Sequence, residues 1–349
     1  MFNKKMILVL VLLTALASVA NAGDYKVYGK LHTSIDMLNN SEDSQMFLSS
    51  NTSRFGVKGA QELNENFSFI WQFEQKLNIA QFGDETLANR NSFIGVKGNW
   101  GTFLVGIHDT PYKMLGRKLT FFFDELGDFR TVTMGWDRRL QDVAAYVSPN
   151  FNGFSFVGAY QFDQGDKYTG GDNYEAQSAF SANAMYAKDA LLIGAAMEQL
   201  SKGYAYDAGT DTYGESQMGM RFGGKYTMDK FAIALMYQSL SDKGGVADLK
   251  ASTMGGEVKF QFDPKFAAKG SYYMADPDTD TDDDDYAQLA IGLDHTYAKN
   301  LSFYVQYAMV TNGDASSAKL AGGWHGCSVS PSAAGETASG FSVGSWFKF

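Results

Sequence analysis

The sequence has little cysteine, little proline and a shortage of positive charge. A single cysteine, Cys327, occurs among 349 residues, so no intramolecular disulfide framework can stabilise the chain. Only five prolines occur, and no Pro-rich or Ser-rich linker divides the chain, which indicates one domain. Lys and Arg number 29 against 39 Asp and Glu, and this acidic balance argues against nucleic acid as a partner.

Long hydrophobic runs are also missing beyond the amino terminus. Runs such as residues 190–197 and 231–237 are far shorter than the roughly 20 residues that a transmembrane helix needs. In lipid, a spanning structure must satisfy all of its own backbone hydrogen bonds, and the only other architecture that does so is a closed β-barrel. Any membrane-spanning part of this chain is therefore expected to consist of β-strands.

The amino terminus has the layout of a secretory signal peptide. Two lysines precede an apolar run that starts at Met6, and the small residues Ala20 and Ala22 follow that run. The run is too short to span a bilayer, so we expect residues 1–22 to be removed and residues 23–349 to form the mature domain. Cleavage removes two basic and no acidic residues, which leaves 27 basic against 39 acidic residues and a net charge of −12.

Apolar and polar residues alternate with a period of two through the mature chain. In residues 25–37, apolar side chains such as Leu31 share one parity, and Lys30 and His32 take the other; residues 67–77 repeat the pattern. These segments reach the roughly 9–11 residues that a tilted barrel strand needs, whereas strands of soluble sandwiches average about five or six. The pattern predicts an all-β fold, a transmembrane antiparallel β-barrel.

Connections of two sizes alternate along the sequence. Short turns, for example residues 98–101 and 228–230, alternate with long polar stretches, for example residues 201–215 and 311–339. Outer-membrane barrels of bacteria have short periplasmic turns, long outer loops and an even number of strands. Counting the segments between these connections predicts about sixteen strands.

The final segment ends on an aromatic residue. Phe341, Val343, Phe347 and Phe349 share one parity, and this strand must pair with the first one to close the ring. A last strand that ends on an aromatic residue looks like the signal by which the outer-membrane barrel assembly machinery captures a barrel, as an added edge strand. We therefore predict that Phe349 is an assembly signal.

Four short motifs follow one another in the first half of the mature chain. They are VYGK at residues 27–30, SRFGVKG at 53–59, RNSFIGVKG at 90–98 and YVSP at 146–149. In this order and spacing they resemble the general bacterial porins, the trimeric diffusion channels of Gram-negative outer membranes. The resemblance implies a homotrimer in outer-membrane lipid that passes small hydrophilic solutes and ions passively, with no cofactor and no enzymatic reaction.

The resemblance also implies a constriction in the pore. The third outer loop, at about residues 111–136, is expected to fold into the lumen and to present acidic side chains to a basic cluster on the wall. The acidic candidates are Asp124, Glu125 and Asp128, and the basic candidates are Lys30, Arg54, Arg90 and Arg139. Parity independently assigns Lys30 and Arg54 to the polar face, whereas the alternation leaves open whether Arg138 or Arg139 faces the lumen.

Other chemistry has weak support in the sequence. The four histidines have no metal-ligand spacing and no Ser-His-Asp set can be assembled, so neither a catalytic nor a metal site is predicted. The run from Asp276 to Asp285 offers alternate carboxylates to Ca²⁺, but it lacks the central glycine of an EF-hand loop, and a solvated acidic loop is the favoured interpretation. Cys327 is interpreted as a free thiol, with an intermolecular bond as the alternative.

Two other functions stay open at this point. One is a surface adhesin or receptor that acts through its outer loops, and the other is a barrel-embedded hydrolase with a catalytic set at the outer rim. The ion preference of a channel is open as well. The net charge of −12 favours cations, whereas the arginines of the wall favour anions.

Overall fold

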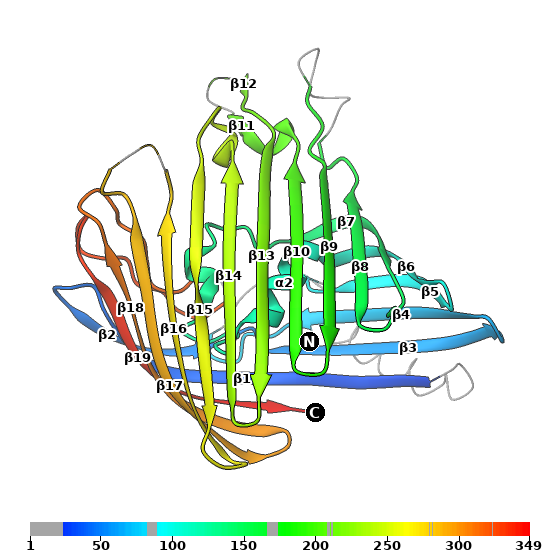
Figure 1. The fold of residues 1–349 in the computed structure, drawn as a ribbon, viewed down its shortest axis with the longest axis horizontal. Helices are drawn as coiled ribbons and strands as arrows, with labels where there is room; N and C mark the ends of the chain where they lie inside the picture. Colours follow the sequence, from blue (N-terminus) through cyan, green and yellow to red (C-terminus); the bar gives the residue numbers. More distant parts are fainter. Residues whose placement is uncertain are drawn as a thin grey trace, which may run out of the picture.

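All but two short strands of the described residues form one antiparallel sheet that closes on itself. The computed structural model describes residues 24–81, 89–165, 174–207, 210, 212–278, 280, 282–322 and 324–349; the predicted signal peptide lies outside them. In the described residues, β1 pairs with β19 on one side and with β2 and β3 on the other, so the ring is closed. The prediction of about sixteen strands is confirmed, because β2 and β3 are two parts of one strand (Figure 1).

The strands of the ring follow one another in sequence order. They are β1 (Asp24–Asn39), β2 (Ser44–Ser50), β3 (Arg54–Asn64), β4 (Phe67–Lys76), β5 (Ser92–Gly98), β6 (Gly101–Asp109), β7 (Arg139–Val147), β8 (Phe154–Gln161), β9 (Ala179–Lys188), β10 (Leu191–Leu200), β13 (Gln217–Met228), β14 (Phe231–Ser241), β15 (Ala251–Gln261), β16 (Phe266–Asp276), β17 (Tyr286–Ala298), β18 (Leu301–Asn312) and β19 (Ala338–Lys348). A separate two-stranded sheet joins β11 (Tyr206–Asp207) to β12 (Thr212–Tyr213).

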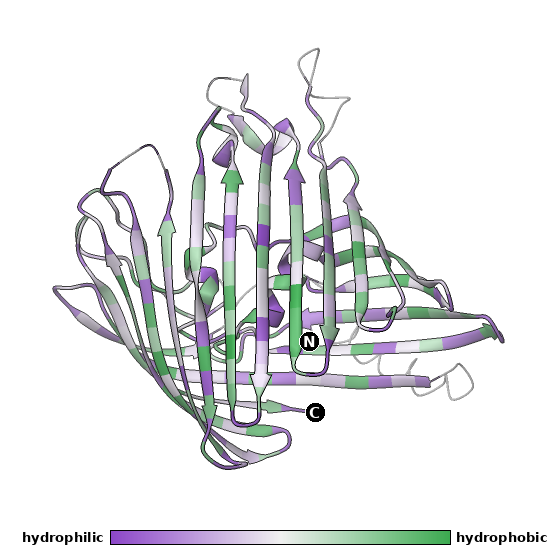
Figure 2. Ribbon diagram, in the orientation of Figure 1, coloured by the Kyte–Doolittle hydropathy of each residue, from purple (hydrophilic) through white to green (hydrophobic). Residues whose placement is uncertain are grey.

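The two faces of the wall follow the predicted alternation. On β1 the polar side chains of Lys30, His32 and Asp36 are buried, whereas Ile35 and Met37 are about half exposed on the other face. Green and purple bands accordingly alternate along the strands in Figure 2. Because successive side chains of a strand point to opposite faces, the ring turns one polar face inward and one apolar face outward.

The connections have the two predicted sizes, with one exception. Short turns join pairs such as β5 and β6 or β13 and β14, and long segments join most of the other pairs. The exception is the first outer connection, residues 40–43, which is as short as a turn. Its Asn40 side chain accepts hydrogen bonds from the amides of Glu42 and Asp43, so the segment satisfies its own backbone without a longer loop.

Residues 110–138, between β6 and β7, hold the largest buried apolar side chains of the described chain. The segment contains α2 (Pro111–Leu119) and the short 3-10 helix η1 (Phe129–Val132). Thr110 caps α2 by accepting from the amide of Lys113, and Pro111 occupies the first turn, where its missing N–H costs nothing. Among the residues that the structure describes, the other 3-10 helices are η3 (Lys202–Ala205) and η4 (Lys243–Gly245). No helix within the described ranges is both long and apolar enough to cross a membrane.

Within this segment, α2 lies against strands β8, β9, β10, β13 and β14, and η1 lies against β16 and β17. Figure 1 shows α2 behind the strands β10 and β13. Tyr112, Leu115, Leu119, Phe122, Leu126, Phe129, Val132 and Trp136 are each at most 1% exposed. Spaced three and four residues apart, Tyr112, Leu115 and Leu119 lie on one face of α2. The main apolar core of the protein is therefore built on residues 110–138 instead of between two sheets.

Glycines on the facing strands make room for this segment. A Cβ atom on Gly194 of β10 would lie 2.7 Å from Leu115, and one on Gly219 of β13 would lie 2.5 Å from Trp136. A Cβ on Gly223, four residues further along β13 and on the same face, would overlap Leu119. The absence of side chains at these inward positions allows the segment to approach the wall closely.

Candidate functional site

The four predicted basic wall residues lie on neighbouring strands of one part of the ring. Lys30 belongs to β1, Arg54 begins β3, Arg90 precedes β5 and Arg139 begins β7. Lys30 and Arg90 are buried, and Arg54 and Arg139 are partly buried. The β1–β3 register pairs Lys30 directly with Arg54, so two like charges are neighbours across the sheet. Such a pair needs a compensating anion nearby.

Asp124 of segment 110–138 supplies that anion. Its carboxylate lies 3.2 Å from Nζ of Lys30, 3.7 Å from Nη1 of Arg54 and 2.9 Å from Nη2 of Arg130. Burial by itself raises the pKa of the Asp124 carboxyl, but Lys30, Arg130 and Arg54 outweigh it and hold that pKa well below its usual value. The Asp124 carboxylate is therefore charged at neutral pH, although Asp124 is only 2% exposed.

The other two predicted acids have different partners. Glu125 lies 2.6 Å from Nζ of Lys269 on β16, a residue that the sequence reasoning did not single out. Burial raises the pKa of Glu125 to about 7, against the opposing attraction of Lys269. Asp128 caps η1 by accepting from the amide of Arg130, and it pairs with the guanidinium of the same residue. Of the three acids, Asp124 alone contacts the predicted basic wall residues within the described part of the chain.

The wall arginines also pair with carboxylates of the wall itself. Arg90 Nε lies 2.6 Å from Oε1 of Glu74 on β4, and Arg54 lies 3.7 Å from the same carboxylate. Arg139 contacts Asp109 at the end of β6, at 2.9 Å. Glu74 lies on the parity of residues 67–77 that carries the charged side chains. The alternation in this segment could therefore have identified Glu74 as an inward residue.

Arg138 and Arg139 both lie inside the ring but in different surroundings. Arg138 lies over the rings of Trp136 and Tyr204, and its Nε is 3.6 Å from Glu198 of β10. Arg139 instead donates to Asn91 at 2.7 Å and lies beside Asp109. Arg139 therefore belongs to the same group as Arg90, whereas Arg138 belongs to the side against which α2 packs.

Segment 110–138 carries cations of its own. Lys113 and Arg117 of α2 contact Asp109 at 3.2 Å and 2.6 Å, and Arg117 lies over the ring of Phe123. Arg130 lies over the same ring. The segment thus presents Arg117 and Arg130 together with Asp124. The sequence reasoning missed these cations because it searched the segment for acids only.

Two cavities adjoin these charges. The loop-side cavity, of about 270 Å³, is lined by Thr52, Lys76, Arg90, Lys113, Arg117, Phe123, Asp124, Arg130, Thr133, Gly135, Asp137, Arg139 and Trp324. The turn-side cavity, of about 430 Å³, is lined by Lys26, Tyr28, Gly29, Lys30, Arg54, Lys58, Gln72, Glu74, Arg90, Asn91, Arg117, Lys348 and Phe349. Both share Arg90 and Arg117, so these two side chains lie where the cavities meet.

The lining of both cavities is strongly basic. Six Lys or Arg face two Asp in the loop-side cavity, and seven Lys or Arg face the single acidic side chain of Glu74 in the turn-side cavity. In a confined space with low-dielectric walls, such an excess of one sign raises the local concentration of the opposite ion. The net negative charge of the chain therefore does not describe the lining of these two cavities.

Phe349 lies where the ring closes. Its amide donates to the carbonyl of Gly29 at 3.2 Å, and the Gly29 amide donates to its carbonyl at 3.0 Å. A Cβ on Gly29 would overlap the Phe349 ring, so the glycine of the VYGK motif makes room for the terminal aromatic. The last residue thus extends the β1–β19 pairing by one further pair of hydrogen bonds.

One group of three possible metal ligands occurs among the described residues. Asp36 of β1 lies beside His325 and Cys327 of the segment between β18 and β19. Sequence spacing did not predict this set because Asp36 and His325 are far apart in the chain. The acidic run from Asp276 to Asp285 includes Thr279 and Thr281, which lie outside the described residues.

Comparisons with known proteins agree on one class. A family model described as Gram-negative porin matches residues 9–315. A chitoporin of Vibrio furnissii is 26% identical over 269 residues, which cover 71% of each chain. The major outer membrane protein P.IB of Neisseria sicca is 24% identical over 343 residues, which cover 89% of this chain and 94% of that protein.

Solved structures share the fold. An anion-selective porin from Comamonas acidovorans superposes with a TM-score of 0.75 at 19% identity, covering 94% of this chain and all of the other. A trimer form of OmpT, an outer membrane protein of Vibrio cholerae, superposes with a TM-score of 0.69, also at 19% identity and with the same coverage.

Proposed function

The chain belongs to the Gram-negative porin family and forms a diffusion channel of the outer membrane, and from this premise we propose that its pore prefers small hydrophilic anions. The observation that carries the proposal is the basic lining of the two cavities, in which Lys and Arg outnumber acidic side chains six to two and seven to one. Solutes would pass down their own gradients, with no bound cofactor and no chemical step.

Segment 110–138 is proposed to narrow the pore. Its side chains contact inward residues of strands that are far apart in the ring: Asp124 meets Lys30 of β1, Glu125 meets Lys269 of β16, and Asp137 meets Arg221 of β13. A segment held to several sides of a closed ring leaves solutes only the space beside it. That space would be the path through the two cavities.

Arg90 and Arg117, where the cavities meet, and Arg54 of the turn-side cavity are proposed to set the ion preference. Glu74 offsets part of the charge of Arg90 and Arg54, and Asp109 offsets part of the charge of Arg117. The excess of cations over carboxylates still creates a field that attracts anions and repels cations at close range. Acidic residues that make the whole chain negative, such as Asp278, Asp280 and Asp285, lie in the outer loop after β16 and line neither cavity.

Association with other copies of the chain follows from the family, and we propose that the assembly is a homotrimer. The outward apolar face would contact outer-membrane lipid and neighbouring subunits, since residues such as Leu235, Ile291 and Leu293 are more than half exposed on the isolated chain. Phe349 is proposed to be read by the barrel assembly machinery as an edge strand before the ring closes on Gly29.

The test is electrical. The purified protein, reconstituted into a planar bilayer, should give stepwise ohmic conductance. In a KCl gradient, its reversal potential should be shifted from zero toward the equilibrium potential of chloride. A reversal potential shifted toward the equilibrium potential of potassium would overturn the anion preference, although the protein would still be a channel. A folded barrel that inserts without conductance would overturn the channel itself.

A further inference from the structure

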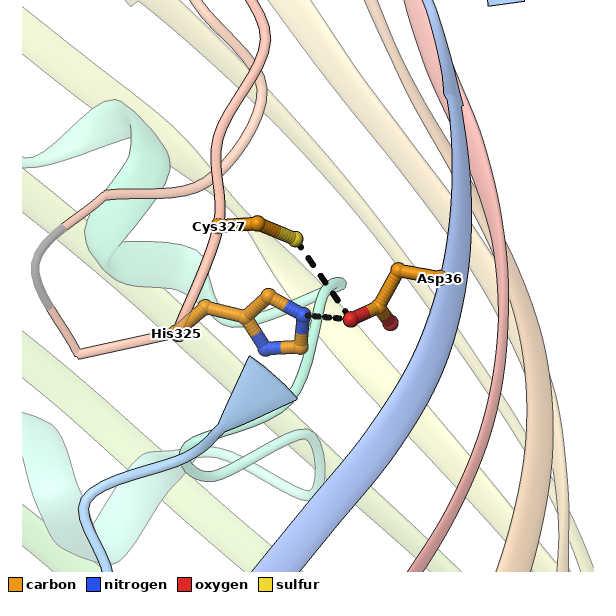
Figure 3. A group of neighbouring side chains, drawn as sticks. All are labelled: Asp36, His325 and Cys327. Atoms are coloured by element: carbon orange, nitrogen blue, oxygen red, sulfur yellow. Dashed lines mark hydrogen bonds and ion pairs between the residues drawn. The ribbon is translucent and has the colours of Figure 1, made fainter. Parts of the chain in front are cut away.

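Three side chains of different chemistry converge beside β1, near the end that leads into the first outer connection (Figure 3). Oδ2 of Asp36 lies 3.2 Å from Nε2 of His325 and 3.4 Å from Sγ of Cys327. All three candidate ligand atoms lie within 4.8 Å of one another. Neither Asp36 nor Cys327 nor His325 lines either of the two cavities of the proposed pore.

The cluster is withdrawn from solvent. Asp36 is fully buried, His325 is 4% exposed and Cys327 is partly buried. The pair is also incompletely satisfied, because both imidazole nitrogens of His325 and Oδ1 of Asp36 are buried without a hydrogen-bond partner. A buried imidazole beside a carboxylate and a thiol has an electrostatic reason to accept a cation.

The peptide that carries two of the ligands is held in place independently of them. The Gly326 amide donates to Oδ1 of Asn51 at 2.9 Å, and a Cβ on Gly326 would lie 2.6 Å from the Ser50 amide nitrogen. Further along, Leu320 and Val329 exchange two backbone hydrogen bonds that close the base of the loop. The backbone of His-Gly-Cys is thus seated against the wall, which fixes the positions of the two ligands before any ion binds.

The three donor atoms and the distances between them suit a transition-metal ion of intermediate softness, such as Zn²⁺. In tetrahedral zinc sites, bonds of about 2.0–2.3 Å separate neighbouring ligand atoms by roughly 3.3–3.5 Å. The observed separations of 3.2 Å and 3.4 Å are close to that spacing. A thiol sulfur is a poor ligand for Ca²⁺ or Mg²⁺, which prefer oxygen.

We propose that Asp36, His325 and Cys327 bind one Zn²⁺ ion, with a fourth position left for water. The ion would tie the last outer loop to the inner face of β1. Trp324, next to His325, lines the loop-side cavity, and the guanidinium carbon of Arg130 lies 4.9 Å from the centroid of its ring. Metal binding would therefore hold one part of the wall of the proposed pore in place.

The same three residue types also occur in thiol hydrolases, but the arrangement differs. A catalytic histidine lies between the thiol and the carboxylate, so that it can take the proton of the thiol. In this protein the carboxylate of Asp36 is the shared partner of both His325 and Cys327. With the carboxylate in the central position, the arrangement favours a set of metal ligands over a catalytic thiol activated by a histidine base.

The experiment measures Zn²⁺ bound to the folded full-length mature barrel in detergent after desalting. The expected result is one Zn²⁺ per chain, with at least a tenfold loss of affinity in Cys327→Ser and in Asp36→Asn. The matched control is His295→Asn, because His295 stacks on Phe266 at the other end of the barrel and should leave Zn²⁺ binding unchanged. Migration of unheated samples on gels checks that each variant is folded.

A second measurement needs no variant. Cys327 is the only cysteine in the chain, so Zn²⁺ should slow its modification by a thiol reagent, and Co²⁺ should give the absorption band of a thiolate bound to cobalt. An unchanged modification rate together with no cobalt–thiolate band would overturn the proposal. Zn²⁺ binding that survives both Cys327→Ser and Asp36→Asn would overturn it as well, and would assign the ion to the exposed carboxylates of the outer loops.

Discussion

The two sides of the barrel interior have the same alternating strand pattern but differ in the residues at the inward positions. On the side of β1 to β7, inward positions carry Lys30, Arg54 and Arg139, and cavities remain beside them. On the side of β9 to β14, inward positions such as Gly194 and Gly223 carry no side chain, and α2 packs directly against the wall. Period-two alternation selects which face is inward, and the size and charge of the inward residue decide whether that part of the wall borders a cavity or packs against the segment.

The largest effect is expected from the shared carboxylate on the basic side. Asp124→Asn leaves Lys30, Arg54 and Arg130 without their common anion, which should cost about 3–5 kcal/mol of stability. Urea unfolding of the barrel measures the loss. The same replacement at the exposed turn residue Asp189 should change little, and equal losses in both variants would remove the special role of Asp124.

A smaller effect is expected on the packed side. Gly223→Leu overlaps Leu119 and should cost about 1–3 kcal/mol, which raises the population of a displaced segment by roughly 5- to 150-fold. Single-channel recordings should then show larger or more frequent high-conductance states. Gly158→Leu is the control, because its added side chain meets open space. Unchanged recordings for Gly223→Leu would mean that the packing of α2 against β13 does not determine the width of the pore.

Next in size is the ion preference. Arg54→Ala removes one cation from the turn-side cavity and leaves Glu74 less neutralised, so the anion-to-cation permeability ratio should fall about two- to fivefold, or roughly 0.4–1 kcal/mol. Reversal potentials in a KCl gradient measure the ratio. Lys299→Ala removes the same charge from an exposed turn and should leave the ratio unchanged. A ratio unaffected by Arg54→Ala would mean that Arg54 is only a solvated wall charge.

The smallest effect concerns pH. Because burial raises the pKa of Glu125 to about 7, this carboxyl is largely neutral at pH 6 and largely charged at pH 8. The added negative charge should lower the anion preference by less than about twofold over this range, since Lys269 lies next to it. Glu125→Gln should remove this step from the pH profile of the reversal potential. A step that persists in the variant would belong to another group.

Most of the fold could be predicted from the sequence, whereas most pairings could not. Alternation and turn spacing are local, so they identified the strands, their number and the inward parity of Lys30 and Arg54. The contacts of Glu125 with Lys269 and of Asp137 with Arg221 had no local signal, because they depend on where residues 110–138 lie relative to the ring.

The sequence by itself determined that this chain is a closed barrel whose last residue, Phe349, ends the strand that must meet the first. The tertiary structure decided which charges become neighbours. Asp36, His325 and Cys327 come from distant parts of the chain and are neighbours because β1 pairs with β19 and the segment between β18 and β19 lies against β1. The physical reason is that strand patterning acts over a few residues, whereas ring closure brings together side chains that no sequence period relates.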